Sequence, residues 1–178
     1  LLLQMNLLQS TNNFAYILVL LFLLPFYSCR HIEDENHHYV IPFINNSNKA
    51  IYIASPGHQD TTVTDCGALS QPQLYKALPK DMNTSALDMN VPWEIVFGDR
   101  NRLPNDTLTI FVFDAEKLEA RNAHVKYSLL ARYDLSLRDL QRANWVLFYP
   151  PLENMKDIKM WPPYKQASSQ SAKNDSIS

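Results

Sequence analysis

Glycine and cysteine are scarce in this chain, and the chain has no marked excess of either charge. Only three glycines and two cysteines occur among its 178 residues. With so few glycines there is no glycine-rich loop of the kind that cradles phosphate groups, which argues against nucleotide chemistry of that type. The formal net charge is −2 and no basic patch is evident, so the sequence also argues against nucleic acid as a partner.

The region before Cys29 contains no Lys, Arg, Asp or Glu, and an apolar run occupies residues 14–24. This run is too short for a membrane span, which needs about 20 apolar residues, but it suits the core of a signal peptide. Ser28 supplies the small residue wanted before a lipidated cysteine, although two bulky aromatic residues precede it and the usual positive charge is missing. We therefore predict a lipoprotein signal peptide over residues 1–28, with an ordinary cleaved signal or an uncleaved anchor as alternatives.

The remaining chain is predicted to form one domain with short flanking segments. Residues 29–38 are expected to be an acidic tether, residues 39–164 a single β-rich domain, and residues 165–178 a disordered tail rich in Ser, Gln, Asn and Lys. About 150 residues follow the signal, which is enough for a domain with its own core. Lipidation of Cys29 leaves Cys66 unpaired, as a small buried hydrophobe, whereas a Cys29–Cys66 disulfide is the competing interpretation.

The apolar patterns predict six or seven short strands and one or two short helices. We expect strands at 39–44 and 50–53 joined as a hairpin, and further strands at 93–97, 107–113, 129–135 and 145–149. The 107–113 segment is apolar on both faces, which predicts a central position. Ser136 and Asp139 form a variant capping box that begins a helix ending near Asn144. The predicted fold is a small β-sandwich, immunoglobulin-like or transthyretin-like, with an α+β layer as the alternative.

Several motifs occur together between residues 106 and 151. They are Asp-Thr-Leu at 106–108, Ile-Phe-Val-Phe-Asp at 110–114, Leu-Ala-Arg-Tyr-Asp-Leu-Ser-Leu at 130–137, Asn-Trp-Val at 144–146 and Tyr-Pro at 149–150. In these motifs the chain resembles small uncharacterised lipoproteins of the Bacteroidota. The resemblance implies a lipoprotein of the outer membrane or cell surface with a β-rich architecture. It implies no reaction, because that family has no known activity.

Three triplets resemble the O-glycosylation signal of the same phylum, in which Asp precedes Ser or Thr and then a residue such as Thr, Leu or Ile. They begin at Asp60, Asp106 and Asp175. The sugar acceptors that this resemblance implies are Thr61, Thr107 and Ser176. Coincidence combined with ordinary turn chemistry is the alternative explanation.

Two pairs of residues, each with at least one histidine, invite a chemical interpretation that their spacing does not support. His37 and His38 are adjacent, and neighbouring histidines point in different directions on an extended chain, so no metal site is predicted. His58 and Cys66 share an irregular segment at 55–89. No third group at a recognisable spacing orients them, and no catalytic residues or cofactors are predicted.

Two further motifs look like sites, and each also has a structural explanation. In Arg132-Tyr133-Asp134, alternation sends Tyr133 to one face of a strand and its neighbours to the other, where a cross-strand ion pair is the ordinary outcome. Trp161-Pro162-Pro163-Tyr164 follows the last predicted strand. It either folds back onto the domain or leaves Trp161 and Tyr164 exposed for contact with a partner.

These observations predict a non-enzymatic lipoprotein with a binding or structural role in the cell envelope. It is expected to contact the membrane through a lipid on Cys29, and an unknown protein or glycan is its expected partner. The first alternative is an immunity-type inhibitor of a secreted toxin or enzyme, with the 55–89 segment as its contact surface. The second alternative is a hydrolase that uses the region of His58 and Cys66.

Overall fold

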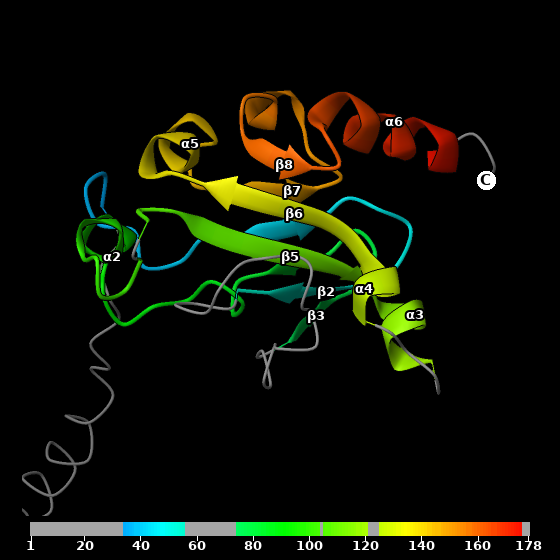
Figure 1. Cartoon of the computed structure of the whole chain (residues 1–178), viewed down its shortest axis with the longest axis horizontal. Helices are drawn as coiled ribbons and strands as arrows, with labels where there is room; N and C mark the ends of the chain where they lie inside the picture. The colour runs from blue at the N-terminus through cyan, green and yellow to red at the C-terminus, as the bar shows by residue number, and fades with distance from the viewer. Residues whose placement is uncertain (1–33, 56–73, 104, 121–124, 176–178) are drawn as a thin grey trace, which may run out of the picture. The chain divides into compact units, whose positions relative to one another are not determined.

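The computed structural model describes residues 34–55, 74–103, 105–120 and 125–175. The chain divides into two units, Leu1–Ile32 and Glu33–Ser178, and all described residues belong to the second. Within that unit the described residues are mostly β, with a five-stranded sheet, a three-stranded sheet and short helices (Figure 1). The predicted mostly β fold, compatible with a small β-sandwich, is therefore confirmed.

The five-stranded sheet has the order β3-β2-β5-β6-β8, and each neighbouring pair is antiparallel. Its members in chain order are β2 (Ile51–Ala54), β3 (Tyr75–Ala77), β5 (Leu108–Asp114), β6 (Leu129–Leu135) and β8 (Lys159–Trp161). All seven residues of β5 are buried, and β5 is the middle strand of the sheet. The prediction of a central strand in this part of the sequence is confirmed.

The three-stranded sheet has the order β4-β1-β7. Its strands are short: β1 (Phe43–Asn45), β4 (Met82–Asn83) and β7 (Leu147–Tyr149). Strand β1 runs antiparallel to β4 and parallel to β7. Both sheets contribute to one apolar core, in which Phe43 of β1 stacks on Tyr133 of β6 with ring centroids 6.3 Å apart.

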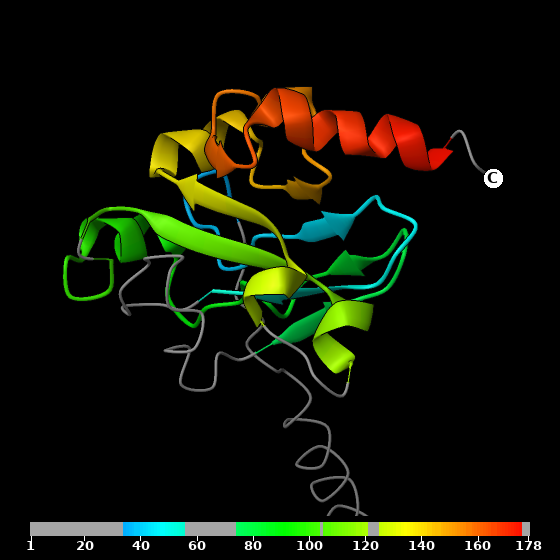
Figure 2. The ribbon, with the colours of Figure 1, turned by 45° about the vertical axis from the view of Figure 1, so that its right-hand side comes forward.

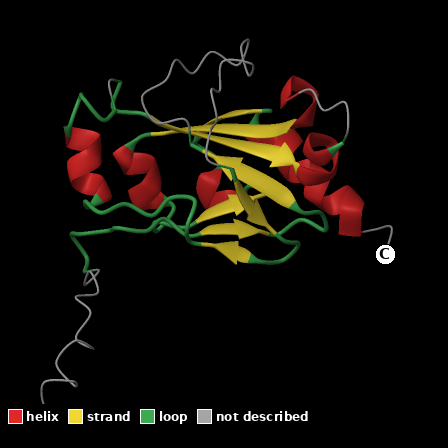
Figure 3. Ribbon diagram, turned by 90° about the horizontal axis from the view of Figure 1, so that it is seen from below, coloured by secondary structure: helices red, strands yellow, loops and turns green. Residues whose placement is uncertain are grey.

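The helices lie mainly beyond the ends of the strands, as the turned views show (Figures 2 and 3). They are α2 (Trp93–Gly98), α3 (Ala115–Glu119), α4 (Val125–Ser128), α5 (Leu137–Arg142), η3 (Glu153–Met155) and α6 (Tyr164–Asp175). Helix α5 begins with the predicted capping box: the Asp139 amide donates to Ser136 Oγ, and the Ser136 amide donates to Asp139 Oδ2. No helix of the described ranges is long and apolar enough to cross a membrane.

The prediction of a strand at 93–97 is wrong, because this segment forms helix α2. A short apolar run does not distinguish a strand from a helix by its periodicity alone. Trp93, Val96 and Phe97 are buried, and their spacing of three and four places them on one helical face. Pro92 directly precedes the helix, where its missing N–H causes no loss because the first turn has no intrahelical acceptor for it.

The predicted hairpin between 39–44 and 50–53 is also wrong, because β1 and β2 belong to different sheets. The turn chemistry itself is present: the Ser47 amide donates to Asn45 Oδ1 at 3.0 Å. Asn45 Nδ2 donates to the carbonyls of Lys49 at 2.7 Å and Leu78 at 2.9 Å. The turn therefore directs the chain from one sheet to the other.

The chain beyond β7 is more ordered than the sequence suggests. Strand β8 extends the five-stranded sheet by pairing with β6, with Trp161 opposite Arg132. The expectation of a disordered tail from residue 165 differs from the structure, in which Tyr164–Asp175 form α6. Ala167 is buried on this helix, so the segment packs on the domain through at least one side chain.

Candidate functional site

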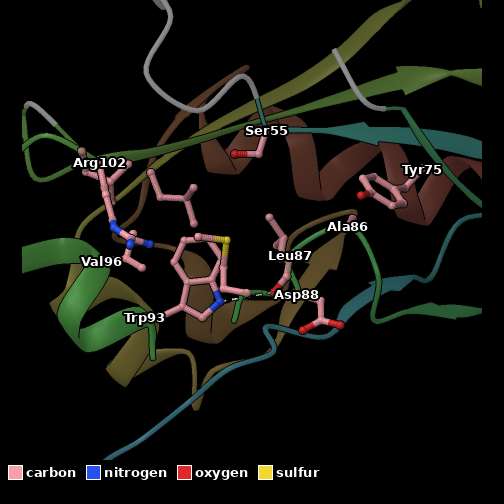
Figure 4. Close-up of a pocket in the computed structure, with 11 residues that line it drawn as sticks. Ser55, Tyr75, Ala86, Leu87, Asp88, Trp93, Val96 and Arg102 are labelled. Carbon is pink, nitrogen blue, oxygen red and sulfur yellow. Dashed lines mark hydrogen bonds between the residues drawn. The ribbon is translucent and has the colours of Figure 1, made fainter. Parts of the chain in front are cut away.

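A cleft of about 410 Å³ lies between α2, the adjoining ends of β2 and β3, and the segment 86–89 (Figure 4). Buried apolar side chains line much of it, among them Leu87, Trp93, Val96, Leu103 and Leu108. A volume of this size falls within the range of about 300–1,000 Å³ that is typical of small-molecule sites. The cleft is the strongest candidate for a binding site in the described part of the chain.

Helix α2 and the neighbouring backbone fix the aromatic wall of the cleft. Trp93 and Val96 are three residues apart, so the helix places both on the same face. The indole Nε1 of Trp93 donates to the Leu87 carbonyl at 3.2 Å, and the Ile41 amide donates to the same carbonyl at 3.1 Å. Because this hydrogen bond orients the ring, the wall is preorganised before any ligand enters.

The turn after α2 places one charged and one apolar side chain at the cleft, and Asp99 organises this turn. The Asp99 carbonyl accepts from the amides of Arg102 at 2.8 Å and Leu103 at 2.9 Å. Its carboxylate accepts from the Asn101 amide and forms an ion pair with Arg102 Nε at 3.2 Å. Arg102 is therefore held at the rim, whereas Leu103 is buried in the wall.

Two hydroxyl groups line the cleft on the side of β2 and β3. Ser55 directly follows β2, and Tyr75 begins β3, where it pairs with Ile53. Figure 4 shows Arg102 and Tyr75 on opposite sides of the cleft, with the Tyr75 hydroxyl turned toward it and the Asp88 carboxylate turned away. The lining thus combines an apolar body with a few convergent polar groups, an arrangement typical of ligand sites.

Beside the cleft, His38 fixes the start of the domain to α2. Its Nδ1 lies 2.6 Å from Glu94 Oε1, its amide donates to Glu94 Oε2 at 3.1 Å, and its carbonyl accepts from the Trp93 amide at 2.8 Å. The imidazole also stacks on Trp145 with a centroid distance of 3.9 Å and an interplanar angle of 9°. These contacts hold residue 38 against the helix that also forms the wall of the cleft.

The adjacent histidines considered for metal binding have different partners. His37 Nδ1 lies 2.9 Å from Asp34 Oδ1, whereas His38 contacts Glu94. Among the described residues, no group of three or more His, Cys, Asp or Glu side chains is placed to hold a metal ion. Each histidine therefore makes a separate pair with one carboxylate.

Most of the predicted modification and chemistry residues lie outside the described residues. These are the lipidation candidate Cys29, the glycosylation candidates Thr61 and Ser176, and the pair His58 and Cys66. Thr107 is described and lies just before β5, half-buried, where its hydroxyl donates to the Asn105 carbonyl at 2.9 Å.

The two residues predicted to contact a partner have different surroundings. Trp161 lies in β8, and 54% of it is exposed. Tyr164 begins α6, is half-buried, and donates its hydroxyl to Glu153 Oε2 at 3.2 Å. The sequence left two alternatives for this segment, and the structure combines them: the backbone folds back onto β6 while the Trp161 side chain remains exposed.

The Arg132-Tyr133-Asp134 motif has the structural role predicted for it. Tyr133 is fully buried, whereas Arg132 Nε and Asp134 Oδ1 form an ion pair at 2.8 Å on the other face of the strand. Asp134 also accepts from Thr109 Oγ1 at 3.0 Å and lies 3.6 Å from Lys159 Nζ, its register partner on β8. The expected cross-strand ion pair is thus confirmed, with Lys159 as the partner.

Sequence reasoning did not single out the residues of the cleft. Trp93 is a core residue, since only 4% of it is exposed, and it also forms part of the cleft wall, which the strand predicted at 93–97 did not indicate. A helical interpretation of 93–97 would have supplied one signal, because it places Trp93 and Val96 on one face and puts Asp99 and Arg102 in the turn that follows. The contributions of Ser55 and Tyr75 have no comparable local signal.

Searches against protein families, curated proteins and solved structures found no significant match to this chain. The cleft is therefore interpreted from its own geometry.

Proposed function

We propose that this protein is a non-enzymatic lipoprotein of the outer membrane or cell surface whose domain binds a small ligand in the cleft beside α2. The observation that carries the binding role is the cleft itself, about 410 Å³ in volume and lined by buried apolar side chains with few polar groups. The envelope location is supported by the sequence, through the apolar run at 14–24 and its position before Cys29.

The polar groups of the cleft are suited to orienting a ligand. Ser55 and Tyr75 supply hydroxyl groups and Arg102 supplies a guanidinium group. Within the described residues, neither hydroxyl is hydrogen-bonded to a histidine or a carboxylate of the kind that activates a nucleophile. A binding role therefore requires nothing beyond the contacts present, whereas a hydrolytic role requires an activating group.

The binding role is tested with a neutral apolar dye, N-phenyl-1-naphthylamine, whose fluorescence rises when it leaves water. We expect saturable binding to the mature chain and an affinity at least about tenfold lower for Ala86→Trp, because the new indole fills the cleft that Ala86 lines. Ala120→Trp is the matched control, since Ala120 is exposed next to α3 and outside the cleft. Absence of saturable binding, or an equal loss in both variants, would contradict the proposal.

The envelope location is tested by metabolic labelling with a fatty-acid probe. We expect label on the wild-type chain and on Cys66→Ala but none on Cys29→Ala. Cys29 lies just after the apolar run, at the position of a lipidated cysteine, whereas Cys66 lies far beyond it. A wild-type chain without label would refute the lipid anchor while leaving the dye measurement unaffected. The two parts of the proposal are therefore tested separately.

A further inference from the structure

The charge that faces the cleft is positive. Two charged side chains line it, Arg102 and Asp88, and Asp88 is an exposed residue whose carboxylate is turned away from the cleft (Figure 4). Arg102 lies at the rim, and its side chain is 41% exposed. A ligand in the cleft therefore meets one cationic group, which favours an anion over a cation.

The ion pair with Asp99 orients Arg102 without occupying the tip of its guanidinium group. The contact joins Asp99 Oδ2 to Arg102 Nε at 3.2 Å. Among the described residues, Asp99 supplies the only carboxylate that pairs with Arg102, and the two terminal nitrogens of Arg102 form no hydrogen bond. These nitrogens present parallel N–H groups that match the two oxygens of a carboxylate. One guanidinium group already shared with Asp99 suits a single carboxylate better than a doubly charged phosphate.

The interior of the cleft suits the apolar part of a ligand. Trp93, Val96, Leu103 and Leu108 are at most 4% exposed and line its interior. The indole nitrogen of Trp93 is already satisfied by the Leu87 carbonyl, so its ring offers an apolar surface rather than a free donor. An unsatisfied polar group placed against this wall would lose its hydrogen bonds to water without replacement.

We propose that the cleft binds an amphiphilic carboxylate, with its apolar chain against Trp93 and Leu103 and its carboxylate paired with the guanidinium tip of Arg102. This inference rests on the proposed function, in that the cleft is the ligand site, and it adds the chemical class of the ligand. The Tyr75 hydroxyl lies on the far side from Arg102 and is placed to meet a polar atom at the other end of the ligand.

The test compares decanoate with 1-decanol, which has the same chain without the charge. Isothermal titration calorimetry of the mature chain, below the concentration at which decanoate forms micelles, is expected to show about tenfold tighter binding of decanoate than of decanol. Arg102→Gln is expected to abolish this preference by weakening decanoate about tenfold while leaving decanol unchanged. Arg138→Gln is the matched control, because Arg138 is exposed on α5 and does not line this cleft.

Arg102→Lys provides a second variant, since it keeps the charge but not the planar pair of donors. Its preference for decanoate is expected to lie between those of the wild type and Arg102→Gln. If N-phenyl-1-naphthylamine binds but wild-type chain shows no preference for decanoate, or Arg102→Gln retains the full preference, the inference is overturned and the binding function stands. If neither the dye nor either ten-carbon ligand binds, the proposed function itself fails.

Discussion

The two sheets of this domain are stabilised by different kinds of side chain. In the five-stranded sheet, β5 is buried along its whole length, and its apolar residues face two sides. Ile110 and Val112 belong to the main core, whereas Phe111 and Phe113 form a second cluster with Ala54. A strand buried on both faces gains stability from apolar burial over its entire length.

The three-stranded sheet has strands of only two or three residues, and a polar side chain connects it to its surroundings. Asn45 at the end of β1 is completely buried. Its Nδ2 donates to the carbonyls of Lys49, Ala77 and Leu78, and its Oδ1 accepts from the Ser47 amide. The comparison shows that a long apolar strand can define one sheet locally, whereas the short strands depend on hydrogen bonds to distant segments.

The largest effect is expected from Phe113→Ala in the five-stranded sheet. Phe113 is fully buried, and truncation leaves a cavity that its neighbours fill only in part, so unfolding should become easier by about 3–5 kcal/mol. Urea unfolding followed by circular dichroism measures the change. Leu78→Ala is the control, because Leu78 is 56% exposed and should change stability by less than about 0.5 kcal/mol. Similar losses of unfolding free energy in the two variants would contradict the conclusion that apolar burial stabilises the five-stranded sheet.

Asn45→Ala should destabilise the three-stranded sheet by about 2–4 kcal/mol, although it removes few apolar contacts. The reason is that three carbonyls, one in a buried and two in partly buried hydrogen bonds, lose their donor, and each unsatisfied group is costly. The same unfolding measurement applies, with Asn90→Ala as the control, since Asn90 is exposed in the segment before α2. A loss below about 1 kcal/mol for Asn45→Ala would mean that the polar connections matter little for this sheet.

Alkaline pH should weaken the contacts of β7 in the three-stranded sheet. Burial raises the pKa of Tyr149 to about 12, and the Asp114 carboxylate adds to this rise. In the unfolded chain a tyrosine ionises near pH 10, so the stabilisation is fully present below pH 10 and is lost as the pH rises toward 12. Its size is about 2 kcal/mol, from about 1.4 kcal/mol for each pKa unit with a discount for incomplete burial.

Unfolding free energies at pH 8 and pH 11.5 measure this loss, and Tyr149→Phe should reduce it. Part of the loss should remain in that variant, because burial also raises the pKa of Tyr133 well above its ordinary value. Tyr127→Phe is the control, since Tyr127 is 74% exposed and lies on α4, outside the three-stranded sheet. An identical pH dependence in the wild type and Tyr149→Phe would show that Tyr149 does not contribute to it.

The smallest effect concerns a hydrogen bond that joins the two sheets. Tyr133 of β6 donates its hydroxyl to the Phe148 carbonyl of β7 at 3.1 Å. Tyr133→Phe keeps the buried ring and removes this donor, so we expect a loss of about 1 kcal/mol. Tyr164→Phe is the matched control, because its hydroxyl contacts Glu153 at the surface and should contribute less. If the two variants lose equal stability, the hydrogen bond between the sheets contributes no more to stability than the surface hydrogen bond of Tyr164.

Local sequence patterns correctly predicted the elements whose secondary structure is determined by their own residues. The predicted strands in the regions of β5 and β6 are confirmed, because each is a seven-residue strand with a clear apolar pattern. The capping box of α5 is confirmed because its two partners, Ser136 and Asp139, are three residues apart. Helix α2 was missed because a short apolar run fits both periodicities. The hairpin was wrong because turn chemistry does not determine which sheet the next strand joins.

The candidate site was harder to predict than the fold because its parts are distant in the sequence. The lining runs from Ser55 to Leu108 and comes from several elements, and no local pattern in the sequence indicates that these elements meet at one cleft. Arg102 was missed as a ligand contact because the turn after α2 places it beside the cleft, and this turn becomes visible in the sequence only when 93–97 is interpreted as a helix.

By itself the sequence determined the features that depend on interactions between residues close together in the chain. These are the apolar run before Cys29, the burial of β5, the two faces of β6 and the start of α5. Only the tertiary structure decided which strands pair, that β1 and β2 separate into two sheets, and that Trp93, Arg102 and Tyr75 surround one cleft. The physical reason is that burial patterns and caps act between neighbours in the chain. Sheet pairing and clefts depend instead on contacts between segments far apart in sequence, and the order of residues encodes those contacts only through the complete fold.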